Sequence, residues 1–286
     1  MTETGAGAGA EPDDTKMNSL DKMLSILNGF DEATLSLDVA RAAELCGSSR
    51  ASTYRYLQAL TRAGLLTPAS GGSYIIGSRV IELEMLKREN DPLFGSARHL
   101  IRLHAEELGL NVMLCSYYGD KVLCTDIAGS DPAMARLYRP GRSMPIFRGA
   151  MAKVILANLS PAQLRNIYAS NEAQIAKAGL GETLETFTQT LAEVRVAGYC
   201  ITHAEVFDGL VGVAAPVHDS EGRILGSVVF VIASDQFEQL ETDTLVEQIR
   251  DIAAEIEHGI VRRLRRLHKT PVVTAARPRR SVVYRT

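Results

Sequence analysis

Residues 48–58 carry hydroxyl, guanidinium and amide side chains at helical spacing, and these groups are suited to binding nucleic acid. Hydroxyls and arginines bind phosphate oxygens, while arginine can also bind a guanine edge and glutamine an adenine edge. Thr53, Leu57 and Leu60 share one helical face and are expected to pack on a preceding helix, so the polar residues face outward. The predicted DNA-contacting residues are Ser48, Ser49, Arg50, Ser52, Thr53, Tyr54, Arg55 and Gln58.

The distribution of charge supports this interpretation better than the total does. The formal net charge is -3, which does not by itself indicate a nucleic-acid partner. Residues 36–80 nevertheless hold an excess of basic side chains. These are Arg41, Arg50, Arg55, Arg62 and Arg79, against the acidic Asp38 and Glu44. Taken alone, a helix with a basic face can equally be a solvated amphipathic helix, so the interpretation depends on the neighbouring elements.

Three helices and a hairpin are predicted around this segment. The first helix begins near residue 18, where apolar residues recur at helical spacing. The second is predicted to have Ser36 as its cap and Asp38 in its first turn, and to stop at Gly47; the third covers residues 49–63. Residues 65–77 hold two β-prone runs around a Pro and Gly-Gly turn, which indicates a hairpin. This order is typical of a winged helix-turn-helix, whose second helix enters the major groove.

The remaining chain mixes helices with strands. Residues 78–90 predict a connector helix that Asp91-Pro92 interrupts. Beyond it, strands and helices are segregated, which predicts an antiparallel sheet with flanking helices and therefore an α+β fold. The expected strands are 111–118, 121–127, a third possible strand at 133–138, 209–217 and 223–232, and the expected helices are 93–108, 149–159, one starting at Ser160, 184–197 and 239–267.

Composition and element order predict two domains with unstructured ends. Residues 1–17 are predicted to be a disordered leader, 18–79 the winged helix-turn-helix, 80–91 the connector helix, 92–267 the larger α+β domain, and 268–286 a basic disordered tail. The tail either adds sequence-independent DNA affinity or stays solvated, and we favour the second. With neither a secretory signal nor a long apolar run, the chain is expected to be cytoplasmic and to have no membrane partner.

Residues 18–80 resemble the DNA-binding domain of the IclR family of bacterial transcriptional regulators. The matching segments are Leu20-Asp21-Lys22 with Leu27, Leu35-Ser36-Leu37, the run from Arg50 to Leu60, Gly64-Leu65-Leu66, and Tyr74-Ile75-Ile76-Gly77. The sequence departs from the family pattern at Ala51, where a hydroxyl is usual. One common phosphate contact is therefore expected to be missing, unless Ser49 or Ser52 supplies it.

The resemblance continues to about Leu267. Its segments are Gly141 to Pro145, Gly149 to Lys153, Val194 to Tyr199, Asp208-Gly209-Leu210 and Val213 to Val217. It implies that residues 92–267 serve effector binding and oligomerisation, as a GAF-like domain that binds a small-molecule effector, often an organic acid, and as dimers that pair into tetramers. It also implies binding to double-stranded, palindromic operator DNA and regulation of a catabolic or metabolic operon. Neither the sign of regulation nor the effector's identity can be read from the sequence.

Position by position, the resemblance implies an effector pocket around the sheet. The implied residues are Met134 and Arg136 on one strand, Gly149, Ala150 and Met151 at a helix start, His203, and Gly212, Val229 and Val231 on the last two strands. The backbone amides at the Gly149 turn would suit a carboxylate. The apolar run 228–232, and residues 202–205 in place of an acidic run, favour an aromatic or otherwise hydrophobic effector. Val229 and Val231 can equally be plain core residues, and His203 a surface histidine.

Two rival classes of function remain. We find no G-x-S-x-G, P-loop, G-x-G-x-x-G or H-E-x-x-H pattern, so an enzyme is disfavoured and no catalytic residue or cofactor is predicted. His99 and His104 lie five apart and miss the spacing of a helical metal pair. The four cysteines are scattered without C-x-x-C spacing, which favours free buried thiols over a metal site. A winged helix that binds protein rather than DNA is the second rival.

Overall fold

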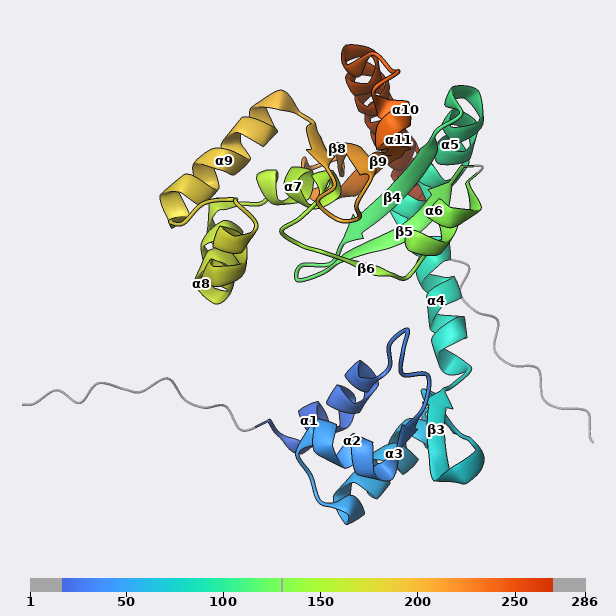
Figure 1. Cartoon of the computed structure of the whole chain (residues 1–286). Helices are drawn as coiled ribbons and strands as arrows, with labels where there is room; N and C mark the ends of the chain where they lie inside the picture. The colour runs from blue at the N-terminus through green and yellow to red at the C-terminus, as the bar shows by residue number, and fades with distance from the viewer. Residues whose placement is uncertain (1–16, 130, 270–286) are drawn as a thin grey trace, which may run out of the picture. The chain divides into compact units, whose positions relative to one another are not determined.

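The computed structural model describes residues 17–129 and 131–269, and the chain divides between Glu89 and Asn90 into two units (Figure 1). Apart from Met17, the predicted leader lies outside the described residues. The predicted tail does so beyond Lys269, because the last helix continues to that residue. In the part of the chain that the structure describes, no helix is both long and apolar enough to cross a membrane.

The N-terminal unit is a winged helix-turn-helix, as predicted. Its elements are α1 (Ser19–Ser25), η1 (Ile26–Gly29), β1 (Leu37–Asp38), α2 (Val39–Cys46), α3 (Arg50–Arg62), β2 (Leu66–Pro68), η2 (Ser70–Gly72), β3 (Ser73–Ile76) and α4 (Arg79–Asn90). The three strands form an antiparallel sheet in the order β1-β3-β2. The hairpin of β2 and β3 is the wing.

Short side-chain caps fix where these helices begin. Asn18 accepts hydrogen bonds from the amides of Leu20 and Asp21 and starts α1. Asp38, rather than the predicted Ser36, caps α2, because its Oδ1 accepts from the amide of Arg41 at 2.7 Å. The helices and strands of the unit pack around a small hydrophobic core. Its buried residues are Ile26, Leu37, Ala42, Cys46, Leu57, Leu60, Leu66 and Tyr74.

The C-terminal unit is built on a six-stranded antiparallel sheet, which confirms the α+β prediction. The strands are β4 (Asn111–Tyr117), β5 (Val122–Ala128), β6 (Ser143–Met144), β7 (Cys200–His203), β8 (Leu210–His218) and β9 (Ile224–Ala233), in the order β6-β5-β4-β9-β8-β7. The helices are α5 (Pro92–Leu108), α6 (Pro132–Leu137), α7 (Ala150–Ala157), α8 (Pro161–Lys177), α9 (Leu184–Ala197), α10 (Ser234–Phe237) and α11 (Thr242–Lys269).

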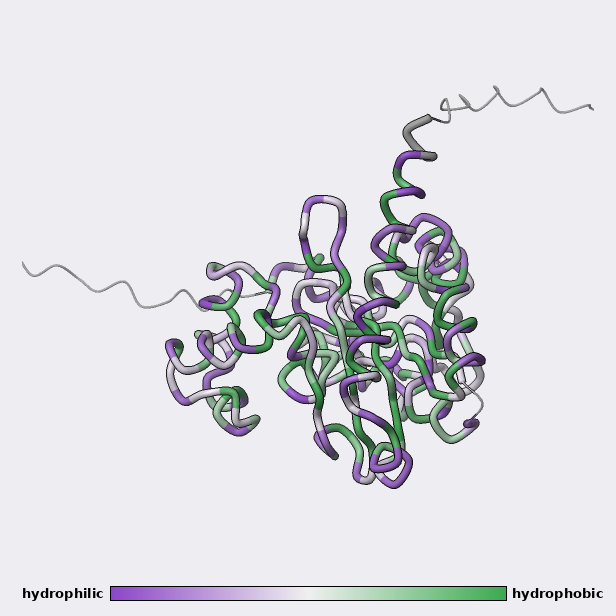
Figure 2. Tube along the Cα trace, turned by 90° about the horizontal axis from the view of Figure 1, so that it is seen from above, coloured by the Kyte–Doolittle hydropathy of each residue, from purple (hydrophilic) through white to green (hydrophobic). Residues whose placement is uncertain are grey.

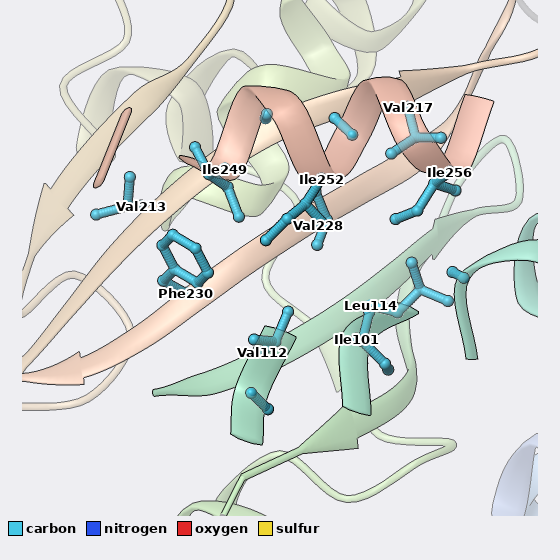
Figure 3. Close-up of a cluster of buried hydrophobic side chains, with 14 of the residues drawn as sticks. Ile101, Val112, Leu114, Val213, Val217, Val228, Phe230, Ile249, Ile252 and Ile256 are labelled. Atoms are coloured by element: carbon cyan, nitrogen blue, oxygen red, sulfur yellow. The ribbon is translucent and has the colours of Figure 1, made fainter. Parts of the chain in front are cut away.

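Both faces of the central strands are covered. On one face, α5 and α11 pack against the sheet, and Figure 3 shows Ile252 and Ile256 of α11 turned towards Val228 and Val217. On the other face, α7 packs against β8 and β9. Because successive strand residues point to opposite faces, a strand buried on both sides is apolar throughout. This explains the uninterrupted apolar run 228–232. Figure 2 shows hydrophobic and hydrophilic stretches alternating along the Cα trace.

Three parts of the C-terminal unit differ from prediction. Residues 133–138 were predicted as a strand, but α6 occupies most of them, because Asp131 caps the amide of Ala133 and Pro132 takes the first helical position. The short strands β6 and β7 were not predicted, since two to four residues give little periodicity. By contrast, Ser160 and Gln163 form the expected capping box at the start of α8.

Candidate functional sites

The turn between α2 and α3 sets the position of the candidate recognition helix. Gly47 adopts a left-handed conformation with φ 56°, which ends α2 and suits a residue without a Cβ. Ser49 then caps α3, because its Oγ accepts a hydrogen bond from the amide of Ser52 at 3.3 Å. Three residues, 47–49, therefore separate the end of α2 from the start of α3, which is the short turn typical of the helix-turn-helix motif.

The outward face of α3 carries the predicted polar residues. Arg50, Tyr54, Arg55 and Gln58 are exposed, while Leu57 on the opposite face is fully buried. None of the four exposed side chains is needed for the core, so the sequence there is free to serve binding.

Two serines at this end of α3 are already linked. Ser52 Oγ accepts from Ser49 Oγ at 3.2 Å and lies 3.4 Å from a guanidinium nitrogen of Arg55. Both contacts use Ser52 as acceptor, which leaves its hydroxyl hydrogen for a further acceptor. Ser48 is half-buried and its Oγ donates to the carbonyl of Cys46 at 3.3 Å, within the turn.

Thr53, which the sequence analysis included among the DNA contacts, is instead a core residue. Its side chain is 0% exposed, its Oγ1 donates to the carbonyl of Ser49 at 3.0 Å, and the Cys46 sulfur lies 3.6 Å away. A side chain enclosed between two helices cannot reach a phosphate or a base. Its role is to fix α3 against α2, and we remove it from the candidate contacts.

The C-terminal unit contains an internal cavity between α7, β8 and β9. It is lined by Met113, Tyr138, Gly149, Ala150, Met151, Thr202, Glu205, Val206, Phe207, Leu210, Gly212, Val229 and Val231. Its volume is about 20 Å³, roughly the room that a single water molecule needs. Any larger ligand therefore requires the lining to move apart.

The structure brings six of the nine predicted effector residues together around this cavity: Gly149, Ala150, Met151, Gly212, Val229 and Val231. The other three lie elsewhere. Met134 is buried in the adjoining core on α6, and Arg136 of that helix is exposed. His203 is exposed, and its ring packs edge-on against Phe237 at a centroid distance of 5.4 Å. The predictions for Met134 and Arg136 followed the family resemblance and assumed a strand where α6 lies, and the prediction for His203 came from comparing residues 202–205 with the family's acidic run.

The first amides of α7 are already hydrogen-bonded within the chain. The amide of Gly149 donates to Glu205 Oε2 at 2.9 Å, and the amide of Ala150 donates to Thr202 Oγ1 at 3.0 Å. Lys153 Nζ, one turn along the helix, lies 2.5 Å from Glu205 Oε1. The Gly149 turn was expected to be open to an effector carboxylate, whereas in the structure the carboxylate of Glu205 lies there.

Residues 204–209, here called the 204–209 loop, cover one side of the cavity. The ring of Phe207 packs edge-on against Tyr138 at 5.2 Å, and the guanidinium carbon of Arg142 lies 5.3 Å from the Phe207 ring centre. Ala204 adopts φ 53°, an uncommon conformation for a residue with a Cβ. Burial raises the pKa of Tyr138 well above its usual value. Residues 202–205 and 208–210 were noted in the sequence, but Glu205, Val206 and Phe207 were not predicted to line the cavity, since they follow no periodic pattern.

Within residues 17–129 and 131–269, no group of three or more His, Cys, Asp or Glu side chains could hold a metal ion. The four cysteines are free: Cys46, Cys115 and Cys124 are buried, and Cys200 is half-buried. The described part of the chain thus offers a polar helix face and an apolar internal cavity as its candidate sites.

A winged helix-turn-helix in one chain with an α+β unit of this kind defines the class of helix-turn-helix transcriptional regulators. The chain belongs to the IclR family within that class. The model of the IclR helix-turn-helix domain matches residues 19–69, and the model of the C-terminal domain of bacterial IclR transcriptional regulators matches residues 89–258.

Individual relatives agree with this assignment. The Pca regulon regulatory protein of Pseudomonas putida is 22% identical over 246 residues, which is 84% of this chain and 84% of that protein. The regulator XynR of Escherichia coli (strain K12) is 22% identical over 85% of this chain and 97% of its own. The structure of an IclR homologue from Microbacterium hydrocarbonoxydans, complexed with 4-hydroxybenzoate, has a TM-score of 0.68 and 18% identity, covering 86% of this chain and 100% of that one. These proteins are transcriptional regulators rather than enzymes, and the solved structure shows the same fold.

Proposed function

We propose that the chain binds operator DNA through α3 and the wing, and that a small molecule bound in the C-terminal unit controls this binding. The observation that supports the first part most directly is the exposed polar face at the start of α3, with Arg50, Tyr54, Arg55 and Gln58 on a helix whose other face is buried. In helix-turn-helix proteins the N-terminal residues of the second helix contact base edges in the major groove.

The contacts divide by chemistry. Arg50 and Arg55 are suited to phosphates or to the paired acceptors of guanine, and Gln58 to adenine. Ser52 retains its hydroxyl hydrogen, so we propose it in place of the hydroxyl that Ala51 lacks; Ser49 is committed to capping the helix. Tyr54 and Ser48 complete the proposed surface.

The test measures binding to a duplex selected from a random-sequence pool. Wild type is compared with the double variant Arg50→Ala, Arg55→Ala by fluorescence anisotropy at several salt concentrations. Each lost phosphate contact reduces the slope of log K against log salt by about 0.9, so losing two reduces it by roughly 2. The ratio of the wild-type to the variant binding constant should then fall about tenfold between about 50 and about 200 mM salt.

A charge-matched control is Arg165→Ala with Arg195→Ala, two exposed arginines on α8 and α9. This control should keep the wild-type slope. If selection yields no enriched sequence, or if wild-type affinity is indifferent to salt, DNA binding is refuted. Retained binding of a protein partner under those conditions would favour the adaptor role instead.

The proposed assembly and setting rest on family membership. A palindromic operator presents two equivalent half-sites, so we propose a homodimer or a tetramer of this chain. A protein that binds the chromosome of a bacterium acts in the cytoplasm, where we place it. The regulated genes would be a catabolic or metabolic operon.

The effector is proposed to be a small organic molecule with a large apolar part. The cavity lining is mostly apolar, with Met113, Met151, Val229 and Val231 among its residues. Methionine side chains adapt their shape easily, which suits a cavity that must expand around a ligand. The homologue from Microbacterium hydrocarbonoxydans was solved with 4-hydroxybenzoate, an aromatic compound, and this supports an aromatic effector.

A further inference from the structure

We propose that Glu205 is a specificity-determining residue: it occupies the anion-binding end of α7, so that the cavity accepts uncharged apolar effectors and rejects carboxylates. This inference rests on the proposed effector-binding function and specifies its ligand class. It depends on three observations: the hydrogen bonds of Glu205, the way its loop is held, and the nature of the remaining lining.

The carboxylate of Glu205 uses the groups that an external carboxylate would need. One oxygen accepts from the Gly149 amide at 2.9 Å and the other lies 2.5 Å from Lys153 Nζ, while Thr202 takes the Ala150 amide. The side chain of Lys153 is 16% exposed and that of Glu205 is 29% exposed. The positive end of α7 and the Lys153 ammonium are therefore both neutralised by the chain itself.

The 204–209 loop holds Glu205 in place from both sides. On one side, the amide of Ala204 donates to the carbonyl of Leu210 at 2.8 Å. On the other, Phe207 is packed between Tyr138 and Arg142. A tethered group competes with free ligand at a high effective concentration, of millimolar order even for a flexible tether. A dissolved carboxylate must outcompete this anchored one.

The rest of the lining offers little to an anion. Apart from Glu205 and the lysine that it neutralises, the groups around the cavity are aliphatic and aromatic side chains with the hydroxyls of Tyr138 and Thr202. A carboxylate that entered without displacing Glu205 would lie near a like charge in a poorly hydrated space, which is unfavourable. An uncharged aromatic ligand avoids both the like-charge repulsion and the loss of hydration. A polar substituent on its ring can hydrogen-bond to the hydroxyl of Tyr138 or Thr202.

Glu205 lines both the cavity and a groove on the outside. The groove has a volume of about 630 Å³ and is also lined by Arg148 and Lys177, among others. A displaced or substituted Glu205 would therefore open the end of α7 towards a basic groove. Replacing this one carboxylate is expected to convert the site into one that accepts carboxylates.

The test uses two probes of matched shape, 4-hydroxybenzoate and 4-hydroxybenzamide, with binding to the full chain measured by titration calorimetry at neutral pH. Wild type should bind the amide about tenfold or more tightly than the acid. Glu205→Gln keeps an acceptor for the Gly149 amide but removes the charge, and it should shift the ratio towards the acid by about tenfold. Glu205→Ala should shift it in the same direction.

Asp208→Ala is the matched control, because it removes an exposed carboxylate from the same loop. It should keep the wild-type ratio. An unchanged ratio in both Glu205 variants, a wild-type preference for the acid, or no binding of either probe to any variant would overturn the inference. Operator binding is measured on the same proteins without probe. Failure of the wild type to bind operator would instead refute the proposed DNA-binding function, so the two failures are distinguishable.

Discussion

Thr53 was predicted to contact DNA, but its burial indicates a structural role. The substitution Thr53→Val tests which of the two roles is correct. Valine has nearly the same shape, so the substitution removes the hydroxyl and leaves almost no cavity. The substitution removes the hydrogen bond from Thr53 Oγ1 to the Ser49 carbonyl and the weaker contact of the same hydroxyl with the Cys46 sulfur at 3.6 Å. That carbonyl also accepts from the Thr53 amide at 2.9 Å, so it does not become an unsatisfied buried acceptor.

The expected cost is therefore that of one ordinary hydrogen bond, about 1 kcal/mol. For a unit of this size, such a loss lowers the melting temperature by roughly 4–8 °C. Hydrogen exchange of the α3 amides, followed by mass spectrometry, measures the opening free energy of the N-terminal unit separately from the rest of the chain. Below the melting range, affinity for the selected duplex should stay within about twofold of wild type, since a twofold change is well under 1 kcal/mol.

Ser52→Ala is the control, because Ser52 is the next residue and only half-buried. Ser52→Ala should lower the affinity for the duplex more than it lowers the stability of the N-terminal unit. The structural reasoning fails if Thr53→Val lowers DNA affinity severalfold while the exchange-derived stability stays unchanged. That result would mean that the threonine hydroxyl reaches the DNA.

The other predictions concern the C-terminal unit. Ile252 is 1% exposed on the face of α11 that covers the sheet (Figure 3), so Ile252→Ala should cost about 2–5 kcal/mol in urea unfolding, whereas the exposed Glu247→Ala on the same helix should change little. Burial raises the pKa of Cys124 from its usual 9.0 to about 12 and that of Cys200 to about 11. Because the thiolate is the reactive form, both should resist a disulfide reagent at pH 8 until the chain unfolds. The folded state holds these protons more tightly than the unfolded state, so their contribution to stability is full below about pH 9 and falls as pH rises through that value. Rapid labelling in the folded state at pH 8, or stability that increases above pH 9, would contradict this.

Most of the local structure could be predicted from the amino-acid sequence, because helix caps, glycine stops and periodicity act over a few residues. The winged helix-turn-helix follows from such signals, with Gly47 ending one helix and the capping Ser49 starting the next. The capping box at Ser160 was equally readable. Residues 133–138 were wrongly predicted as a strand, although the local sequence indicates a helix. Asp131 followed by Pro132 is a typical helix start.

Which side chains are exposed for binding and which already have partners depends on how distant elements pack together. Thr53 reads as a polar residue of a recognition helix, and its burial becomes visible only when α2 is packed against it. Glu205 and Gly149 are 56 residues apart in the chain, and no periodicity or cap signal connects them. Sheet pairing and the course of the 204–209 loop bring the carboxylate to the end of α7. Such long-range contacts depend on the packing of whole elements, and for that reason the sequence could indicate a binding site for a carboxylate but not that the chain supplies the carboxylate itself.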